Sequence, residues 1–225
     1  MDINLNKKKS KNKKRLVRQI IGVLVGTIMM GFSISWLALC GLGMDGYSAL
    51  NMAVSERLGI SFGTWQAVFN CILFVPVLIW GRNQIGFGMF ANILLVGYSC
   101  DFFSWIWSMA LPQTLFDSLW VRILIVIPAL LCFVMAAAIY MDMELGASPY
   151  DALPFVIHKY ISKIPFKTFR IAYDLLFVVI GYLFGAQFAI VTLAMAFLLG
   201  PAIEFVGKEL KPILLKEGEG CAAGK

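Results

Sequence analysis

The chain has 225 residues, of which 60% are hydrophobic and only 14% are charged, and its mean hydropathy is +0.82. Soluble domains carry about 45–50% apolar and about 25% charged residues, so this composition excludes a water-soluble globule. The five cysteines form no C-x-x-C pair, and a single histidine excludes a His-rich metal site. The composition instead indicates a small protein that crosses a membrane several times.

The net charge of +6 is concentrated at the N-terminus. Eight of the 19 lysines and arginines precede residue 19, and an apolar stretch over residues 20–40 follows at once. A basic segment that leads into a span-length apolar stretch is typical of a cytoplasmic anchor that faces anionic lipid. We therefore expect anionic lipid at residues 1–17 and no binding of nucleic acid.

Six segments approach the roughly 20 apolar residues that a helix needs to cross the bilayer. They are 18–40, 62–80, 85–107, 121–141, 168–184 and 186–206. With the N-terminus inside, 17 of the 19 basic residues fall on the inner side, and only Arg57 and Arg122 fall outside. Five or seven spans would place a basic cluster on the wrong side. We therefore predict an all-α, polytopic helical membrane protein with six spans and both termini in the cytoplasm.

The second half of the sequence repeats the first with a shift of 103 positions. Residues 42–50 align with residues 145–153 at five of nine positions, and Tyr47 falls on Tyr150. Because each repeat holds three spans, an odd number, the second must enter the membrane in the opposite sense, which gives inverted 3+3 repeats. The predicted organisation is a basic cytoplasmic tail (1–17), a first repeat (18–107), an outer connecting loop (108–120), a second repeat (121–207) and a cytoplasmic tail (208–225).

Between its first two spans, each repeat holds a short helical segment that cannot cross the bilayer. Asp45 can cap the first half-helix with Ser48 three residues on, and Ser148 with Asp151 is the matching capping signature of the second. Secondary transporters place the N-termini of such half-helices beside a solute. Their N–H groups suit an anion, whereas the acidic residues favour a cation or a zwitterion. The alternative is a pair of interfacial helices that seal the mouth of the bundle.

Carboxylates inside the membrane are the next candidates, since one at mid-bilayer costs at least about 2.5–3.5 kcal/mol. Asp174 lies near the middle of the fifth span, and Asn70 occupies the matching place in the second. Asp174 could carry a proton, bind a cation, or pair with Arg170 one turn earlier on the same helix face. Asp101 and Glu204 lie near span ends, where an interfacial role is expected as often as a functional one.

The motif Leu-Gly-x-x-x-Tyr-x-Ala-Leu, present in both halves, resembles that of the YczE/YyaS/YitT family of bacterial integral membrane proteins. Residues 148–153 give the closest match, and the first copy carries Gly46 where the second has Pro149. The resemblance covers roughly residues 18–207. It implies a multi-pass protein of the bacterial cytoplasmic membrane, and it implies no activity and no catalytic residues.

Together these patterns favour a permease, that is a secondary transporter, for a small polar solute, with proton coupling as an option. The sequence shows no enzyme motif, and we expect no enzyme activity, no cofactor and no metal. Two alternatives stay open. One is a non-transporting accessory or scaffold protein, acting as a homo-oligomer or with a membrane partner. The other is the substrate-binding membrane subunit of an ATP-driven importer.

The candidate residues fall into two groups that share Asp174. The candidates for substrate binding are Asp45, Ser48, Asn51, Asn70, Ser148, Asp151 and Asp174. The candidates for proton or ion coupling are Asp174, Asp101 and Glu204.

Overall fold

The computed structural model of the chain describes residues 2–160, 164–187 and 189–215. Over these residues the chain forms eight α-helices and two short 3-10 helices, without a strand, so the predicted all-α class is confirmed. Three basic residues that we placed on the inner side, Lys163, Lys216 and Lys225, lie outside the described residues. The elements are α1 (Asp2–Cys40), α2 (Gly46–Leu58), α3 (Phe62–Trp80), η1 (Arg82–Gln84), α4 (Phe87–Ala110), η2 (Gln113–Asp117), α5 (Leu119–Asp142), α6 (Pro149–His158), α7 (Phe166–Leu183) and α8 (Ile190–Leu215).

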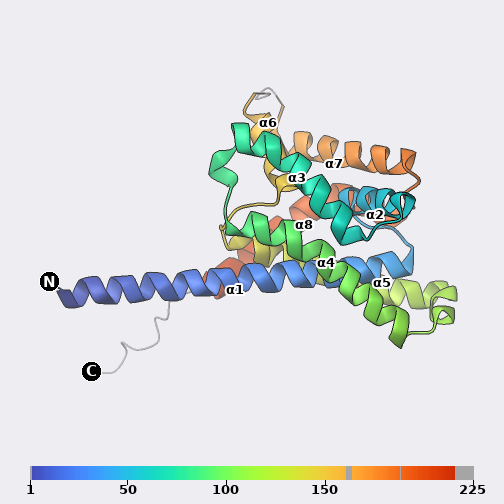
Figure 1. Cartoon of the computed structure of the whole chain (residues 1–225), viewed down its shortest axis with the longest axis horizontal. Helices are drawn as coiled ribbons and strands as arrows, with labels where there is room; N and C mark the ends of the chain where they lie inside the picture. Colours follow the sequence, from blue (N-terminus) through green and yellow to red (C-terminus); the bar gives the residue numbers. More distant parts are fainter. Residues whose placement is uncertain (1, 161–163, 188, 216–225) are drawn as a thin grey trace.

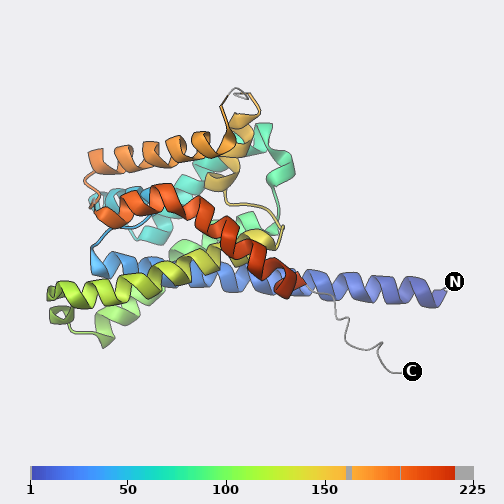
Figure 2. The same cartoon turned by 180° about the vertical axis from the view of Figure 1, so that it is seen from behind.

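Five of the described helices are long and apolar enough to cross a membrane. They are α3, α4 and α5 over their full lengths, α1 over Lys13–Cys40 and α8 over Val191–Lys211. Helix α7 has 18 residues, but it carries three charges, on Lys167, Arg170 and Asp174. Both views show α7 among the other long helices (Figures 1 and 2).

The outer surface of the helices is rich in apolar side chains. Leu124 on α5 is 74% exposed, Leu198 on α8 is 63% exposed and Leu131 on α5 is 62% exposed. A continuous apolar surface of this kind must be covered, and a lipid bilayer covers it on helices of this length. The fold therefore indicates a multi-pass membrane protein that contacts lipid.

The helices form two layers, which are in contact through α3 with α4 and through α8. Helix α1 packs between α4 and α5 in one layer, while α2, α3, α6 and α7 make up the other (Figure 1). Helix α8 packs against α5 and α7 (Figure 2). Helices α1, α4 and α7 run away from the end of the bundle at which the N-terminus projects, and α3, α5 and α8 run back (Figures 1 and 2).

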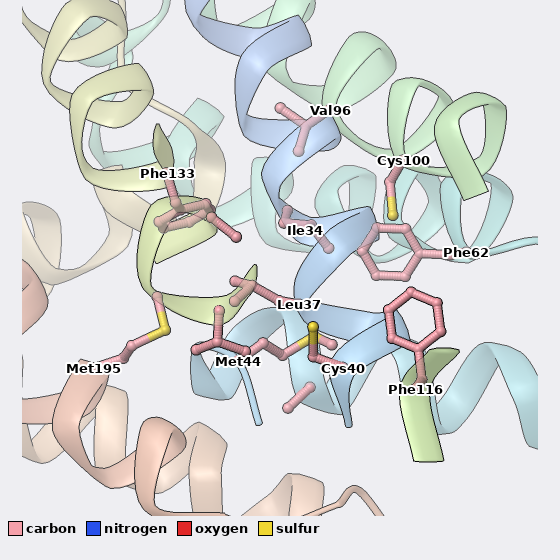
Figure 3. Packing of buried hydrophobic residues seen from close by; sticks show 13 residues of the cluster. Ile34, Leu37, Cys40, Met44, Phe62, Val96, Cys100, Phe116, Phe133 and Met195 are labelled. Atoms are coloured by element: carbon pink, nitrogen blue, oxygen red, sulfur yellow. The ribbon is translucent and has the colours of Figure 1, made fainter. Parts of the chain in front are cut away.

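Helix α1 lies at the centre of the core. Ile34, Leu37 and Cys40 of α1 lie in a buried cluster with Phe133 of α5 and Met195 of α8 (Figure 3). Glycines on α1 let its neighbours approach closely, as they do in membrane bundles. At position 31, for example, an added Cβ would lie 2.5 Å from the carbonyl oxygen of residue 96 on α4.

Local signals set the ends of the short helices. Helix α2 ends at Gly59, whose φ of +66° is a left-handed cap. Helix α3 then begins after Ser61, whose Oγ accepts a hydrogen bond from the N–H of Thr64 at 3.2 Å. Helix α6 begins with Pro149 and has only 10 residues, with Pro154 inside it. The predicted short second half-helix is confirmed, and Pro154, which lacks a backbone N–H, agrees with its small length.

The linkers that lead into α2 and α6 have matching backbone conformations. Each residue of one linker lies 103 positions from its counterpart, which is the shift of the sequence repeat. Glu144 is the non-glycine residue with a positive φ in the described chain. The matched pairs are Gly41 with Glu144 (φ +61° and +55°), Gly43 with Gly146 (φ +96° and +104°), and Asp45 with Ser148 (φ −59° in both).

Two predicted boundaries differ from the structure. The outer loop is shorter than residues 108–120, because α4 continues to Ala110 and α5 begins at Leu119. The basic N-terminal tail is helical from Asp2 onward and projects beyond the bundle (Figure 1). Lysine and arginine are good helix formers, so α1 can extend through them once its apolar part is fixed in the core.

Candidate functional site

The N-terminal ends of α2 and α6 meet in the interior of the bundle. Tyr47 in the first turn of α2 and Tyr150 in the first turn of α6 have ring centroids 4.4 Å apart. Both side chains are buried, with 7% and 9% exposure. At about 1.5 Å per residue, helices of 13 and 10 residues cannot cross a hydrocarbon core of about 30 Å. Each half-helix starts inside the bundle, with its N-terminus at the shared centre.

A side chain caps each half-helix. Asp45 accepts a hydrogen bond through Oδ2 from the N–H of Ser48 at 2.9 Å. Ser148 accepts one through Oγ from the N–H of Asp151 at 3.1 Å, and its hydroxyl donates to Asp151 Oδ2 at 2.7 Å. The capping predicted for both segments is confirmed. These bonds satisfy N–H groups that a helix start otherwise leaves unpaired.

A single arginine ties α6 to α7 beside these starts. Arg170 donates to Asp151 Oδ1 at 2.8 Å and to Asp174 Oδ2 at 3.2 Å. The hydroxyl of Tyr150 donates to the other oxygen of Asp174 at 2.5 Å, and the guanidinium lies 5.2 Å from the centre of the Tyr150 ring. The three charged side chains are only 13–20% exposed. The pairing of Asp174 with Arg170 is confirmed, and Asp151 extends that pair into a cluster.

A central cavity of about 60 Å³ lies where the two half-helices start. A second cavity, of about 210 Å³, shares Asp151 and Arg170 with the first and is also lined by Lys167, Asp174 and Glu204 of α7 and α8. The Arg170–Asp151 ion pair thus forms part of the wall of both cavities. The lining residues of the central cavity that have polar side chains are Asp45, Tyr47, Ser48, Gln66, Asn92, Tyr140, Ser148, Tyr150, Asp151 and Arg170.

Three oxygen atoms on residues that line the central cavity have no hydrogen-bond partner among the described residues. They are Asp45 Oδ1, the Tyr47 hydroxyl and Gln66 Oε1. A buried polar atom without a partner costs about 1–3 kcal/mol, so native proteins satisfy nearly all of them. Residues around the central cavity therefore carry hydrogen-bond acceptors that the described part of the chain leaves unused.

The structure brings together most of the residues predicted to bind solute. Asp45, Ser48, Ser148 and Asp151 line the central cavity, and Asp174 joins them through Arg170.

The two predicted asparagines lie elsewhere. Asn51 is buried, and its side-chain amide donates to the backbone oxygen of Tyr47 at 2.8 Å. Asn70 is also buried, without a hydrogen-bond partner in the described part of the chain. Neither residue is among those that line the central cavity. The predicted meeting of Asn70 and Asp174 at one site is therefore not seen.

Of the residues predicted to couple ions or protons, only Asp174 lies in the ion cluster. Asp101 on α4 accepts a hydrogen bond from the N–H of Gly63 at 2.8 Å, which ties α4 to the first turn of α3. Glu204 is exposed and pairs with Lys208 at 2.7 Å, although it also lines the larger cavity.

Comparison with known proteins places the chain among related sequences. Residues 17–208 match the model of a family of unknown function, DUF6198. The chain belongs to this family. It is also similar to the uncharacterized protein YyaS of Bacillus subtilis (strain 168), with 24% identity over 170 residues that cover 75% of this chain and 82% of that protein. No solved structure matches the chain. The resemblance to YyaS is thus supported, while the resemblance to YczE and YitT stays a prediction.

Sequence reasoning missed six polar residues that line the central cavity of this DUF6198 member, namely Tyr47, Gln66, Asn92, Tyr140, Tyr150 and Arg170. Arg170 counted only as an inner basic residue or as the partner of Asp174, although an arginine one turn before a membrane carboxylate is itself a signal. Tyr47 and Tyr150 were not among the predicted candidates, although the same residue type at positions 103 apart in the repeat is a signal that could have marked them. Gln66 and Asn92 carried no signal that set them apart from polar residues that pair neighbouring helices.

Proposed function

We propose that the chain is a secondary transporter of the bacterial cytoplasmic membrane, a permease for a small polar solute. The observation that carries the proposal is the meeting of two half-helix starts at an interior cavity lined by charged side chains. Secondary transporters bind solute near the bilayer midplane, at the ends of interrupted helices. Asp45, Ser48, Ser148 and Asp151 would form this solute site, with Asp174 beside it.

An inverted repeat is part of the proposal, and the packing of the helices supports it. A two-fold axis in the membrane plane would exchange α1 with α5, α2 with α6, α3 with α7 and α4 with α8. Helix α2 packs on α7, and α6 packs on α3, as such an exchange requires. Likewise α1 packs on α4, and α5 packs on α8. The matching φ angles of the two linkers agree with the same exchange.

Six spans follow if α7 crosses the membrane with its charges turned inward. The partial burial of Arg170 and Asp174, and their pairing with each other and with Asp151, support this placement. Ionisable residues in membrane spans typically face the bundle interior and pair with one another. Helix α7 would then be the fifth span and α8 the sixth.

The distribution of basic residues supports cytoplasmic termini. Arg82 in η1, Lys159 after α6 and Lys167 in the first turn of α7 belong to the end of the bundle from which the N-terminus projects (Figure 1). Arg57 and Arg122 belong to the opposite end, where α2 finishes and α5 begins. Inner loops of membrane proteins carry the excess of lysine and arginine.

The ion cluster suggests how solute binding could be coupled to opening. Arg170 shares its charge between Asp151 and Asp174 in the wall between the two cavities. A proton or a cation that neutralises either carboxylate would weaken its bond to Arg170 and free the guanidinium to move. Asp174 would then be the coupling residue.

Reconstitution into liposomes tests the proposal. Amines, amino acids, organic acids and sugars would be screened with and without a proton gradient, and we expect flux of at least one class above protein-free liposomes. Asp174→Asn should lower that flux at least about tenfold, since it weakens a charge-assisted contact. Glu209→Gln, which changes an exposed carboxylate on α8, should leave it unchanged.

Two other results would replace the proposal. A stable membrane partner or homo-oligomer without any flux would favour the accessory or scaffold role. Co-purification with an ATPase, together with uptake that requires ATP, would favour the importer subunit. A demonstrated flux that Asp174→Asn leaves untouched would remove the coupling role of Asp174.

A further inference from the structure

We infer that the central cavity binds a small primary ammonium group, with Asp45 as its counter-ion. The inference rests on the proposed function and names the substrate class of the same site.

The charges around the central cavity do not balance. Asp151 and Asp174 share the single positive charge of Arg170. Asp45 has no salt bridge among the described residues, and its Oδ2 caps α2 by accepting a hydrogen bond from the N–H of Ser48. Three carboxylates therefore face one guanidinium. A cation beside Asp45 would reduce the excess negative charge, whereas an anion would increase it.

The unused oxygens of the cavity are hydrogen-bond acceptors. Asp45 Oδ1 and Gln66 Oε1 can only accept, and the hydroxyl of Tyr47 can do so. Gln66 is 2% exposed and Tyr47 is 7% exposed, so bulk water does not reach their side chains freely. A primary ammonium carries three N–H donors and a positive charge, so it can use such acceptors and pair with the carboxylate of Asp45.

The rest of the lining favours an organic ammonium over a metal ion. Ile34, Val96 and Phe133 give the cavity an apolar wall, which suits a short hydrocarbon body. Hard cations such as Ca²⁺ and Mg²⁺ bind through six or more oxygens, several of them from carboxylates, and among the described residues no group of three or more His, Cys, Asp or Glu side chains could hold a metal ion. The volume of about 60 Å³ restricts the ligand to a small molecule.

Thermal unfolding of the purified full-length chain in detergent tests the inference. Ethylammonium is the probe, with ethanol and acetate as uncharged and anionic controls of similar size and sodium as a metal control. We expect a saturable rise of the unfolding midpoint with ethylammonium alone. An equal rise with ethanol, acetate or sodium would overturn the inference.

Two variants locate the binding site. Asp45→Asn keeps the helix cap, because asparagine caps as well as aspartate, and should weaken ethylammonium binding at least about tenfold. Gln66→Leu removes one acceptor and should weaken it about three- to tenfold. Glu209→Gln, on the exposed face of α8, should bind as the parent does. Unchanged affinity in Asp45→Asn would contradict the inference.

The outcomes for binding and for transport can be told apart. Flux of an anion or a sugar that depends on Asp174, without ammonium binding, would overturn this inference and leave the permease proposal intact. Ammonium binding that Asp45→Asn abolishes, in a protein that moves no solute, would support the inference and contradict the permease proposal.

Discussion

At the residue scale, Arg170 is the side chain on which the candidate site most depends. It holds Asp151 and Asp174, and all three side chains are 13–20% exposed. Removing one partner of a buried ion pair typically costs about 3–5 kcal/mol, because the remaining charge is left uncompensated. We expect Arg170→Met to lower the free energy of unfolding by about 3 kcal/mol, at the lower end because some exposure remains.

A second ion pair of the same spacing provides the control for Arg170. Lys208 and Glu204 are also four residues apart, but their side chains are 71% and 69% exposed. Lys208→Met should therefore cost less than about 1 kcal/mol. Chemical unfolding in detergent measures the free energy of unfolding of both variants. Equal decreases would show that the buried Arg170 cluster stabilises the fold no more than an exposed ion pair does.

Gly146 is the second residue whose replacement should have a large effect. Its φ is +104°, and an added Cβ would lie 2.7 Å from the backbone nitrogen of Gly86. Gly146→Ala should destabilise the fold by at least about 2 kcal/mol, through the unfavourable backbone conformation and the clash. At Gly200 an added Cβ meets nothing within 4 Å, so Gly200→Ala should change stability by less than about 1 kcal/mol. Thermal unfolding compares the two variants. Similar unfolding midpoints would show that stability does not depend on the backbone conformation and close packing at Gly146.

At the element scale, the starts of the half-helices could be predicted but their meeting could not. The caps at Asp45 and Ser148 are local signals, since each bond spans three residues. The bond from Arg170 to Asp151 spans 19 residues, and the contact of Tyr47 with Tyr150 spans both repeats. Such contacts depend on how α2, α6 and α7 pack, and no local pattern specifies that packing.

The last turns of α8 are tied to the linker after α5 by one exposed ion pair. Lys211 Nζ lies 2.5 Å from Glu144 Oε1, and this hydrogen bond lowers the pKa of Glu144. A carboxyl group whose pKa is lower in the folded than in the unfolded chain stabilises the fold when it is ionised. This stabilisation is fully present above the pKa of the group in the unfolded chain, and it is lost as the pH falls through its pKa in the folded chain. The side chains are 47% and 52% exposed, so solvent screens the pair and we expect only a small contribution to stability.

A pH series of unfolding midpoints tests this ion pair. When the pH is lowered from 7 to below 4, the parent chain should lose slightly more stability than Glu144→Gln, because glutamine does not titrate. Parallel pH profiles for the two proteins would mean that the Glu144–Lys211 pair does not stabilise the fold.

At the scale of the whole molecule, apolar length allowed five long helices to be predicted within a few residues. The remaining predicted span, residues 168–184, corresponds to α7, which carries three charges, so its placement depends on partners that composition does not reveal. Its ion pairs become visible only once α6 and α7 are packed together. Asn70 occupies the position in the repeat that matches Asp174, yet it does not line the central cavity.

The central claim is that the two halves of the chain cross the membrane in opposite senses and meet at their half-helices. Labelling of single cysteines by an impermeant thiol reagent tests it most directly, in a chain whose native cysteines are replaced by serine. Arg82→Cys, between the second and third spans, and Lys159→Cys, between the fourth and fifth, should both be labelled from the cytoplasmic side, and Arg57→Cys from the outside. Labelling of residues 82 and 159 from opposite sides would contradict the claim.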